Sequence, residues 1–277
     1  MQDQDKHESV PLFEHLRASN GVPAPAAGRI DVALLEAGAD SSPACAAMAA
    51  AVETVATELE LELGLSGTSL RLVSFAVAGR GEVPEPGRFR LYLGAGEPAE
   101  GEAAGDALSE GTPLAHLLDS ILGDANAAML ATGETFELVC RWAGVAAPSR
   151  RSETGRGTPL DRLSREAMQH PWFVQFAHEL PDHQHFHVVD DRMSDVILDD
   201  AGKTVPIAFE AAGPTALTML EIARSEDGAM PRFLAMSHHP QLAARNDDRL
   251  LKLTAYYTFL EPLRYHLRRI MRESFEG

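Results

Sequence analysis

The stretch from residue 42 to residue 64 constrains the fold more than any other part of the chain. Ser42-Pro43 is a helix cap followed by proline at the first helical position, and Gly64 is a typical stop. Between these signals, apolar residues recur every three or four positions, as on one face of a helix: Met48, Val52, Val55, Leu59 and Leu63. We therefore expect a long amphipathic helix here.

Strand patterns on both sides of this helix predict a first structural unit. Residues 30–34 alternate apolar and other side chains before the helix, and residues 70–77 and 89–93 follow it with strand-like composition. Thr112-Pro113 repeats the helix-start signal and opens a second amphipathic segment. The resulting βαββα order predicts a ferredoxin-like unit in residues 29–144.

The second half mixes strand and helix patterns. We expect helices at 159–168, 171–180 and 214–224, and a long basic amphipathic helix at 249–273 with a kink at Pro262. Strand patterns lie at 185–189, 196–198, 205–209 and 233–236. Residues 159–277 are therefore predicted to form a mixed sheet with flanking helices, and the whole chain an α/β (α+β mixed) protein.

Length and local composition predict how the chain is divided. A chain of 277 residues exceeds the usual size of one domain, so two small domains are expected. Pro/Ala-rich residues in 1–28 indicate a flexible N-terminal arm, and the polar stretch 145–158 indicates a linker. Residues 97–111 are rich in Glu, Ala and Gly and are expected to form an acidic insertion.

Charge and hydropathy limit the classes of partner. The formal net charge of −17 repels phosphate groups, which argues against nucleic-acid binding. No apolar run approaches the roughly 18 residues that span a bilayer, and the N-terminus is polar, so we expect a cytoplasmic protein without membrane insertion. A protein partner is the expected binding target, and the oligomeric state stays open.

A histidine-rich segment is the best candidate site in the sequence. His183, His185 and His187 would share one face of an extended segment and could bind Zn or Fe. His178 and Asp191 are placed to complete the ligand set. The alternative is a surface turn between a helix and a strand, because the cluster matches no defined metal motif.

Two further motifs have structural explanations. Gly202-Lys203-Thr204 ends like a phosphate loop, but Ile197 stands where that motif needs glycine, so a hairpin turn is expected. His238-His239-Pro240 follows a strand pattern and could deliver a ligand or a general base from a loop. We interpret it as a loop exit before the last helix.

Residues 29–143 resemble the cytoplasmic part of the export-gate (FHIPEP) family of flagellar and type III secretion systems. The phrases that carry the resemblance occur in the family's order: Leu34-Leu35-Glu36-Ala37-Gly38, Glu62-Leu63-Gly64-Leu65, Arg88-Phe89-Arg90-Leu91 and Ala115-His116-Leu117. Ser74-Phe75 stands where the family has an Asp-Asn pair. The resemblance implies a non-catalytic docking module.

These observations give two functional hypotheses. The first is a non-enzymatic protein-interaction or scaffold protein of a bacterial cytoplasmic assembly, for which the resemblance implies a link to secretion. The alternative is a metal-dependent enzyme that uses the His183, His185 and His187 cluster.

Overall fold

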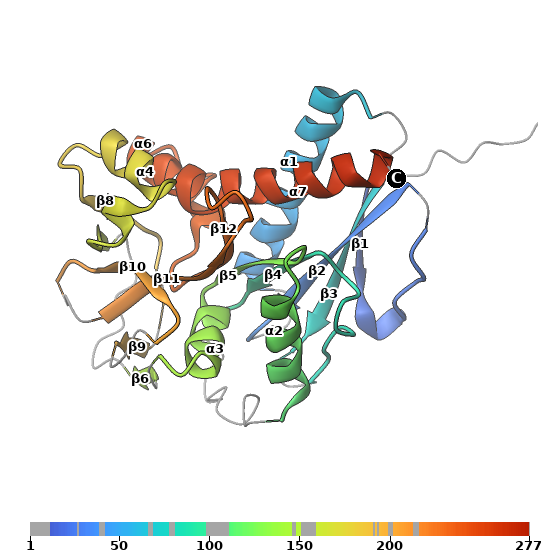
Figure 1. Cartoon of the computed structure of the whole chain (residues 1–277), viewed down its shortest axis with the longest axis horizontal. Helices are drawn as coiled ribbons and strands as arrows, with labels where there is room; N and C mark the ends of the chain where they lie inside the picture. The colour runs from blue at the N-terminus through green and yellow to red at the C-terminus, as the bar shows by residue number, and fades with distance from the viewer. Residues whose placement is uncertain are drawn as a thin grey trace, which may run out of the picture.

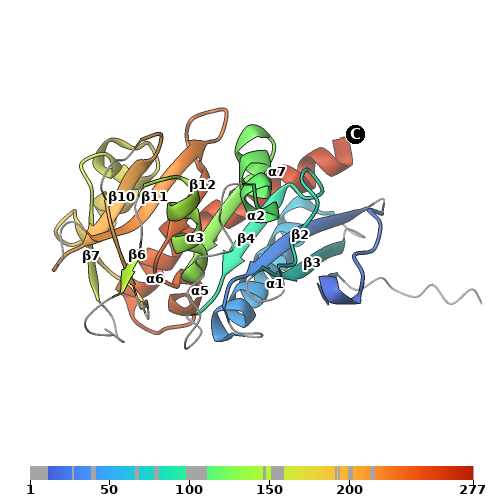
Figure 2. The ribbon, with the colours of Figure 1, turned by 90° about the horizontal axis from the view of Figure 1, so that it is seen from below.

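The computed structural model describes residues 12–26, 28–38, 42–65, 69–77, 81–97, 111–145, 148–150, 159–190, 192, 194–198, 202–212 and 216–276. Their strands form a single 12-stranded sheet (Figures 1 and 2). The main path through the sheet is β1-β3-β2-β4-β5-β12-β11-β10-β7-β8, with β6 and β9 beside it. The α/β class predicted from the sequence is confirmed.

The first part of the chain supplies most of the parallel strands. Its elements are β1 (Phe13–Arg17), η1 (Ala18–Asn20), β2 (Arg29–Glu36), α1 (Pro43–Leu63), β3 (Ser69–Ala76), β4 (Leu91–Ala95), α2 (Pro113–Gly123), β5 (Ala128–Thr132), α3 (Glu134–Trp142) and β6 (Pro148–Arg150).

The later part of the chain completes the sheet and adds the C-terminal helices. Its elements are β7 (Leu160–Leu163), η3 (Ala167–Gln169), α4 (Phe173–Glu179), β8 (His185–His187), β9 (Ser194–Ile197), β10 (Val205–Glu210), β11 (Ala216–Arg224), β12 (Pro231–Met236), α5 (Pro240–Ala243), α6 (Arg249–Ala255), the π-helical segment η4 (Tyr256–Leu260) and α7 (Glu261–Glu276).

Parallel pairing distinguishes this sheet from the ferredoxin-like unit that we predicted. Strands β3 and β4 both pair with β2, one on each side, and both run parallel to it. Strand β5 then pairs parallel with β4, and β12 pairs parallel with β5. The elements of the predicted βαββα unit therefore form part of an open parallel sheet, and the ferredoxin-like description is not confirmed. The chain reverses its direction of winding beside β2, which makes this the topological switch point of the sheet.

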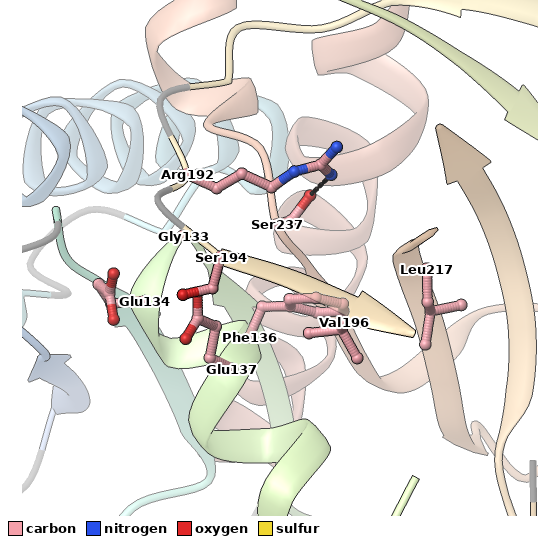
Figure 3. Close-up of a pocket in the computed structure, with 9 residues that line it drawn as sticks. All are labelled: Gly133, Glu134, Phe136, Glu137, Arg192, Ser194, Val196, Leu217 and Ser237. Atoms are coloured by element: carbon pink, nitrogen blue, oxygen red, sulfur yellow. Dashed lines mark hydrogen bonds between the residues drawn. The ribbon is translucent and has the colours of Figure 1, made fainter. Parts of the chain in front are cut away.

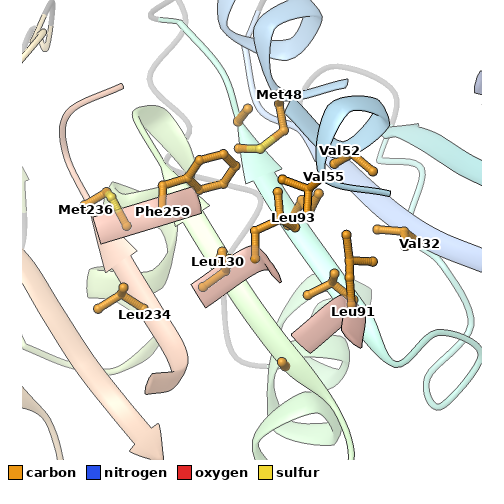
Figure 4. Packing of buried hydrophobic residues seen from close by; sticks show 14 of the residues in the cluster. Val32, Met48, Val52, Val55, Leu91, Leu93, Leu130, Leu234, Met236 and Phe259 are labelled. Carbon is orange, nitrogen blue, oxygen red and sulfur yellow. The ribbon is translucent and has the colours of Figure 1, made fainter. Parts of the chain in front are cut away.

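Helices cover both faces of the sheet. On one face, α1 and α7 lie over the strands, and α2 and α3 lie on the opposite face (Figures 1 and 2). Met48, Val52 and Val55 of α1 point toward the sheet residues Leu91 and Leu93 (Figure 4). The second core, under α2 and α3, includes Leu117, Leu118, Phe136 and Val139. This layered packing holds the ends of the parallel strands in fixed positions.

Three local predictions for the second half were wrong or incomplete, and one strand of the first half was missed. Residues 216–224, expected to be helical, form the buried strand β11. Residues 160–163 form β7 where a helix was expected, and β5 was not predicted at all. The C-terminal helical region is divided into α6, η4 and α7, with its irregular π turn just before Pro262.

The division into two domains stays a prediction. Residues 13–17 of the predicted arm form β1, and residues 148–150 of the predicted linker form β6. The predicted acidic insertion lies, from residue 98 to residue 110, outside the described residues. Within the described ranges, no helix has both the length and the apolar character needed to cross a bilayer.

Candidate functional site at the carboxyl edge of the parallel strands

Three neighbouring strands end at the same edge of the sheet. Strands β4, β5 and β12 are parallel neighbours, so the loops that follow them meet. These loops begin with Gly96 after β4, Gly133 after β5 and Ser237, followed by His238 and His239, after β12. In open parallel sheets, ligands bind outside the carboxyl ends of the strands. The three loops therefore define the candidate site.

Gly133 makes a sharp turn from β5 into α3. Its backbone has φ 59° and ψ −131°, and the helix begins at the next residue, Glu134. The Gly133 N–H donates to the carbonyl of Met236 at 3.0 Å, which ties the turn to the end of β12. A strained strand–turn–helix of this kind is the geometry that presents a nucleophile in many α/β hydrolases. Here the residue at the turn has no side chain.

Two groups fill the space in which a side chain at position 133 would lie. A Cβ atom built on Gly133 would overlap the Gly96 carbonyl oxygen and Cε1 of His239, and would lie 3.0 Å from Nε2 of His239. His239 itself is fully buried. The neighbouring groups therefore leave no room for a side chain at position 133, and glycine itself supplies no nucleophile.

A chain of hydrogen bonds fixes the orientation of His239. The Thr132 hydroxyl donates its only proton to the Gly94 carbonyl at 3.1 Å, so it accepts from Nε2 of Gln241, also at 3.1 Å. The same Gln241 Nε2 lies 3.4 Å from Nδ1 of His239. In the amide orientation of this structure the nitrogen of Gln241 donates to Nδ1, which corresponds to a neutral His239 that carries its proton on Nε2.

This tautomer is unsuitable for a general base. A base that activates a nucleophile at the β5–α3 turn would present an unprotonated Nε2, and a carboxylate at Nδ1 is the group that enforces that form. In its orientation here, Gln241 favours the opposite form. Neither partner of a nucleophile–base pair is therefore available at Gly133.

A buried charged group, the Arg192 cluster, lies beside the turn. We define it as Arg192, Asp190, Asp195, Glu210, Asp161, His238 and Ser237. Arg192 lies 3.2 Å from Asp190, 3.5 Å from Asp195 and 3.1 Å from Glu210. It also donates to the Ser237 hydroxyl at 3.1 Å (Figure 3). The cluster thus joins the loop before β9 to β10 and to the end of β12.

A small cavity separates the Arg192 cluster from α3. Its volume of about 10 Å³ is close to that of one water molecule. Glu137 points toward Ser194 across it, and Arg192 and Ser237 form another wall (Figure 3). The cavity is too small for an organic ligand.

Burial perturbs the pKa values of three side chains in this region: Glu137, which lines the cavity, and Asp161 and His238 of the Arg192 cluster. It raises the pKa of Glu137 to about 7, with the nearby Glu134 adding to the effect. It raises the pKa of Asp161 to about 7 and lowers the pKa of His238 to about 3. Nδ1 of His238 lies 3.7 Å from Asp161, beyond hydrogen-bond distance. Burial therefore favours the neutral form of all three side chains.

A larger groove lies on the α1 side of the carboxyl edge. Its volume is about 250 Å³. Small side chains of α1 leave room along one wall, and Tyr256 and Leu260 of η4 form the other. Arg245 and Gln241, whose Nε2 lies 3.4 Å from Nδ1 of His239, also line it. The full set of lining residues is Ala47, Ala50, Ala51, Thr54, Val55, Glu58, Gln241, Ala244, Arg245, Tyr256, Leu260, Glu261 and Arg264.

The two arginines that line this groove, Arg264 and Arg245, differ in their ion pairs. Arg264 contacts Glu58, and it lies 3.6 Å from Glu261 and 3.7 Å from Glu62. Within the described ranges, no acidic side chain pairs with Arg245, which is exposed at the rim. Among the described residues, the groove therefore holds one arginine without a direct acidic partner, Arg245, and one arginine, Arg264, that pairs with glutamates.

The predicted histidine cluster is not assembled as a metal site. His178 on α4 and His183 lie with their ring centroids 6.1 Å apart, and Nδ1 of His183 lies 3.1 Å from the Ala177 carbonyl oxygen. His185 pairs with Asp182 at 2.7 Å, and His187 follows on β8. Asp191 lies outside the described residues.

The prediction of a metal site is therefore corrected for the part of the chain that the structure describes. No group of three or more His, Cys, Asp or Glu side chains is placed there to hold an ion. The reason is local geometry: His183 belongs to a turn with positive φ rather than to the strand, so it does not continue the face of His185 and His187. The predicted Zn or Fe ion has no such site there.

The sequence patterns had suggested another interpretation of the residues at the carboxyl edge. His238-His239 was assigned to a loop exit, and Gly133 was not singled out because β5 was not recognised. The available signal was an apolar run, Ala127 to Ala131, that ends in Thr132-Gly133 before a helix. A glycine between a buried strand and a helix indicates a tight turn at the edge where sites lie.

Comparison with known proteins found no matching family model and no matching curated protein. Similar solved structures include a glutamine amidotransferase from Thermotoga maritima, with 14% identity, a TM-score of 0.46, and coverage of 90% of this chain and 99% of that one. A glutamine amido transferase from Methylobacillus flagellatus has 9% identity, a TM-score of 0.48, and coverage of 90% and 96%. A ThuA-like protein from Bacteroides uniformis has 10% identity, a TM-score of 0.42, and coverage of 86% and 94%. At these values the likenesses transfer no activity to this chain.

The resemblance to the export-gate family is wrong. Three of the similar structures are named as amidotransferase or ThuA-like proteins, and none of the four that were compared is named as an export-gate domain. The phrases that suggested it occupy a parallel sheet rather than a ferredoxin-like unit. The predicted scaffold role in a secretion-related assembly is corrected for the same reason. Binding to a protein partner stays a prediction, and the oligomeric state stays open.

Proposed function

We propose that this chain binds a small organic anion noncovalently, in the groove between α1, α5 and η4, and forms no covalent intermediate at the β5–α3 turn. The observation that carries the proposal is the groove of about 250 Å³ at the carboxyl edge. Pockets of this kind, with apolar walls and few polar groups, are the usual sites of small ligands.

The charge of the groove supports an anionic ligand. Arg245 has no acidic partner within the described ranges, whereas Arg264 is already shared among carboxylates. Tyr256 and the alanine side chains of α1 would accommodate an apolar body. A carboxylate with a compact apolar or aromatic part therefore fits the groove best.

The turn at Gly133 supports binding without covalent chemistry. Covalent catalysis needs a nucleophile within hydrogen-bond reach of a base. Gly133 provides no nucleophile, and Gln241 holds His239 in the tautomer that donates from Nε2. Both requirements are missing at the position where such chemistry would occur.

Thermal unfolding in the presence of small carboxylates tests the binding. Benzoate, 4-hydroxybenzoate and glutamine form a suitable panel, the last because two of the similar structures are named as glutamine amidotransferases. At least one aromatic carboxylate is expected to raise the unfolding temperature with a saturable dose dependence. Incubation with glutamine is expected to release no ammonia and to leave the intact mass of the protein unchanged.

Matched variants locate the binding site. Ala50→Leu fills the groove and Arg245→Gln removes its unpaired charge, so each is expected to weaken binding about tenfold or more. Ala46→Leu adds the same volume to an exposed position of α1 outside the groove and serves as the control. Glutamine turnover, a covalent adduct, or binding that Ala50→Leu leaves unchanged would refute the proposal.

A further inference from the structure

The groove between α1, α5 and η4 is long enough for its two ends to differ. Ala47 and Glu58 of α1 both line it, and they lie roughly 16 Å apart along the helix axis. Residues of α5 and the turn after it line the groove as well, and so does Arg264 of α7. The charges at each end therefore restrict what the two ends of a ligand can be.

The end of the groove at the carboxyl edge carries its positive charge. Helix α1 begins at this edge, where the Cys45 thiol lies 3.6 Å from the Ala95 carbonyl oxygen at the end of β4. Gln241 of α5 meets the same edge through its contact with Thr132 at the end of β5. Arg245 follows Gln241 by one turn, is exposed, and has no acidic partner among the described residues. This end suits a carboxylate.

The opposite end, where α7 lies across α1, carries a surplus of negative charge (Figure 1). Arg264 contacts Glu58, and it lies 3.6 Å from Glu261 and 3.7 Å from Glu62. Glu62 also pairs with Arg268 at 2.9 Å. Among the described residues, three glutamates therefore share two arginines at this end of the groove.

Glu261 is the glutamate of this group that is best shielded from water. Its side chain is 21% exposed, against 48% for Glu58 and 45% for Glu62. Burial raises the pKa of Glu261, and the negative charge of Glu62 adds to this effect. A further positive charge beside Glu261 would favour its ionised form and would be only partly screened by solvent.

We propose that the groove binds a linear zwitterion, whose carboxylate pairs with Arg245 and whose protonated amine lies beside Glu261 and Glu58. A short apolar or aromatic spacer would lie between them, along Ala51 and Tyr256. An α-amino acid carries both charges on one carbon atom and would therefore reach only one end. This inference rests on the proposed function, because it names the class of ligand for the same groove.

Two benzoates of equal size test the inference. 4-(Aminomethyl)benzoate and 4-(hydroxymethyl)benzoate share the ring and the carboxylate, and only the first carries a positive charge at the far end at about pH 7.5. Calorimetric titration is expected to show about fivefold tighter binding of the amino compound. The difference is expected to shrink at high salt, because salt screens the added ion pair.

The possible outcomes separate the two proposals. Equal affinity for both compounds, or a preference for the hydroxymethyl compound, would overturn this inference and leave the anion site of the proposed function in place. Binding of neither compound would overturn the proposed function and this inference with it.

Neutral isosteres identify the charges responsible. Glu261→Gln and Glu58→Gln each remove one negative charge, so each is expected to bring the affinity ratio of the two compounds toward one. Arg245→Gln is expected to weaken both compounds and to keep the ratio, and so is Glu53→Gln to keep it, since Glu53 is exposed on α1 outside the groove. The ratio compares two ligands on one protein, so a general loss of stability does not alter it. A parent-like ratio in both Glu261→Gln and Glu58→Gln would also overturn the inference.

Discussion

At position 133, backbone conformation and close packing both require glycine. The combination of φ 59° and ψ −131° is strained for residues that carry a Cβ atom. The Gly96 carbonyl and the His239 ring occupy the space that such an atom would need. Sequence alone could not reveal this requirement, because Gly96 and His239 are brought to Gly133 only by the pairing of β4, β5 and β12.

Gly133→Ala is expected to lower the free energy of unfolding by roughly 3 kcal/mol, since backbone strain and overpacking add. Gly64→Ala is the matched control, because Gly64 also has positive φ but has no neighbouring atom within 4 Å of a built Cβ. Its expected loss is about 1 kcal/mol. Urea denaturation of both variants measures the difference, and equal losses would contradict the packing argument.

At the scale of single elements, helix ends were easier to predict than strands. The Ser42-Pro43 signal marks the start of α1, where the Ser42 hydroxyl accepts from the Cys45 N–H at 3.2 Å, and Gly64 follows its end in a left-handed conformation. These signals act through neighbouring residues, so the sequence contains them completely.

Buried strands lack such local signals. A helix was predicted for residues 214–224, whereas residues 216–224 form β11, which is buried along most of its length and therefore has no clear apolar–polar alternation. A short apolar run is compatible with a buried helix or with a strand that is covered on both faces. The neighbours that decide between them, β10 and β12, are set by the whole sheet.

The C-terminal helix α7 is expected to stabilise the fold chiefly through its buried face. Leu267 is fully buried in the core between α1, α7 and the sheet, so Leu267→Ala should lower the free energy of unfolding by about 3 kcal/mol. Arg272→Ala, an exposed change one turn further along, should stay within about 0.5 kcal/mol. Chemical denaturation compares the two, and similar losses would show that α7 acts through its charges.

At the scale of the whole molecule, the pairing of β5 with β12 joins the two halves of the chain. The four residue pairs between these strands run from Phe233 with Met129 to Met236 with Thr132. Trp142 of α3 also stacks on Phe233 at a centroid distance of 5.6 Å. These contacts favour cooperative unfolding of both halves, whatever boundary separates them.

The two tryptophans make this cooperativity measurable. Trp142 lies in the first half, and Trp172 lies in the second half against Tyr257. The single-tryptophan variants Trp142→Phe and Trp172→Phe are each expected to show fluorescence and circular dichroism transitions at one common urea midpoint. Fluorescence transitions that depart from circular dichroism in a way that differs between the two variants would indicate domains that unfold separately.

The close packing around Gly133 also restricts the evolution of a nucleophilic side chain at this position. A codon change to cysteine or serine at this position would meet the Gly96 carbonyl and His239, and Gln241 would still hold the histidine in the wrong tautomer. Gaining covalent chemistry would therefore require changes in three separate loops, each harmful or without benefit alone. Stepwise selection has no favourable first step, so the lineage is expected to retain glycine at this turn.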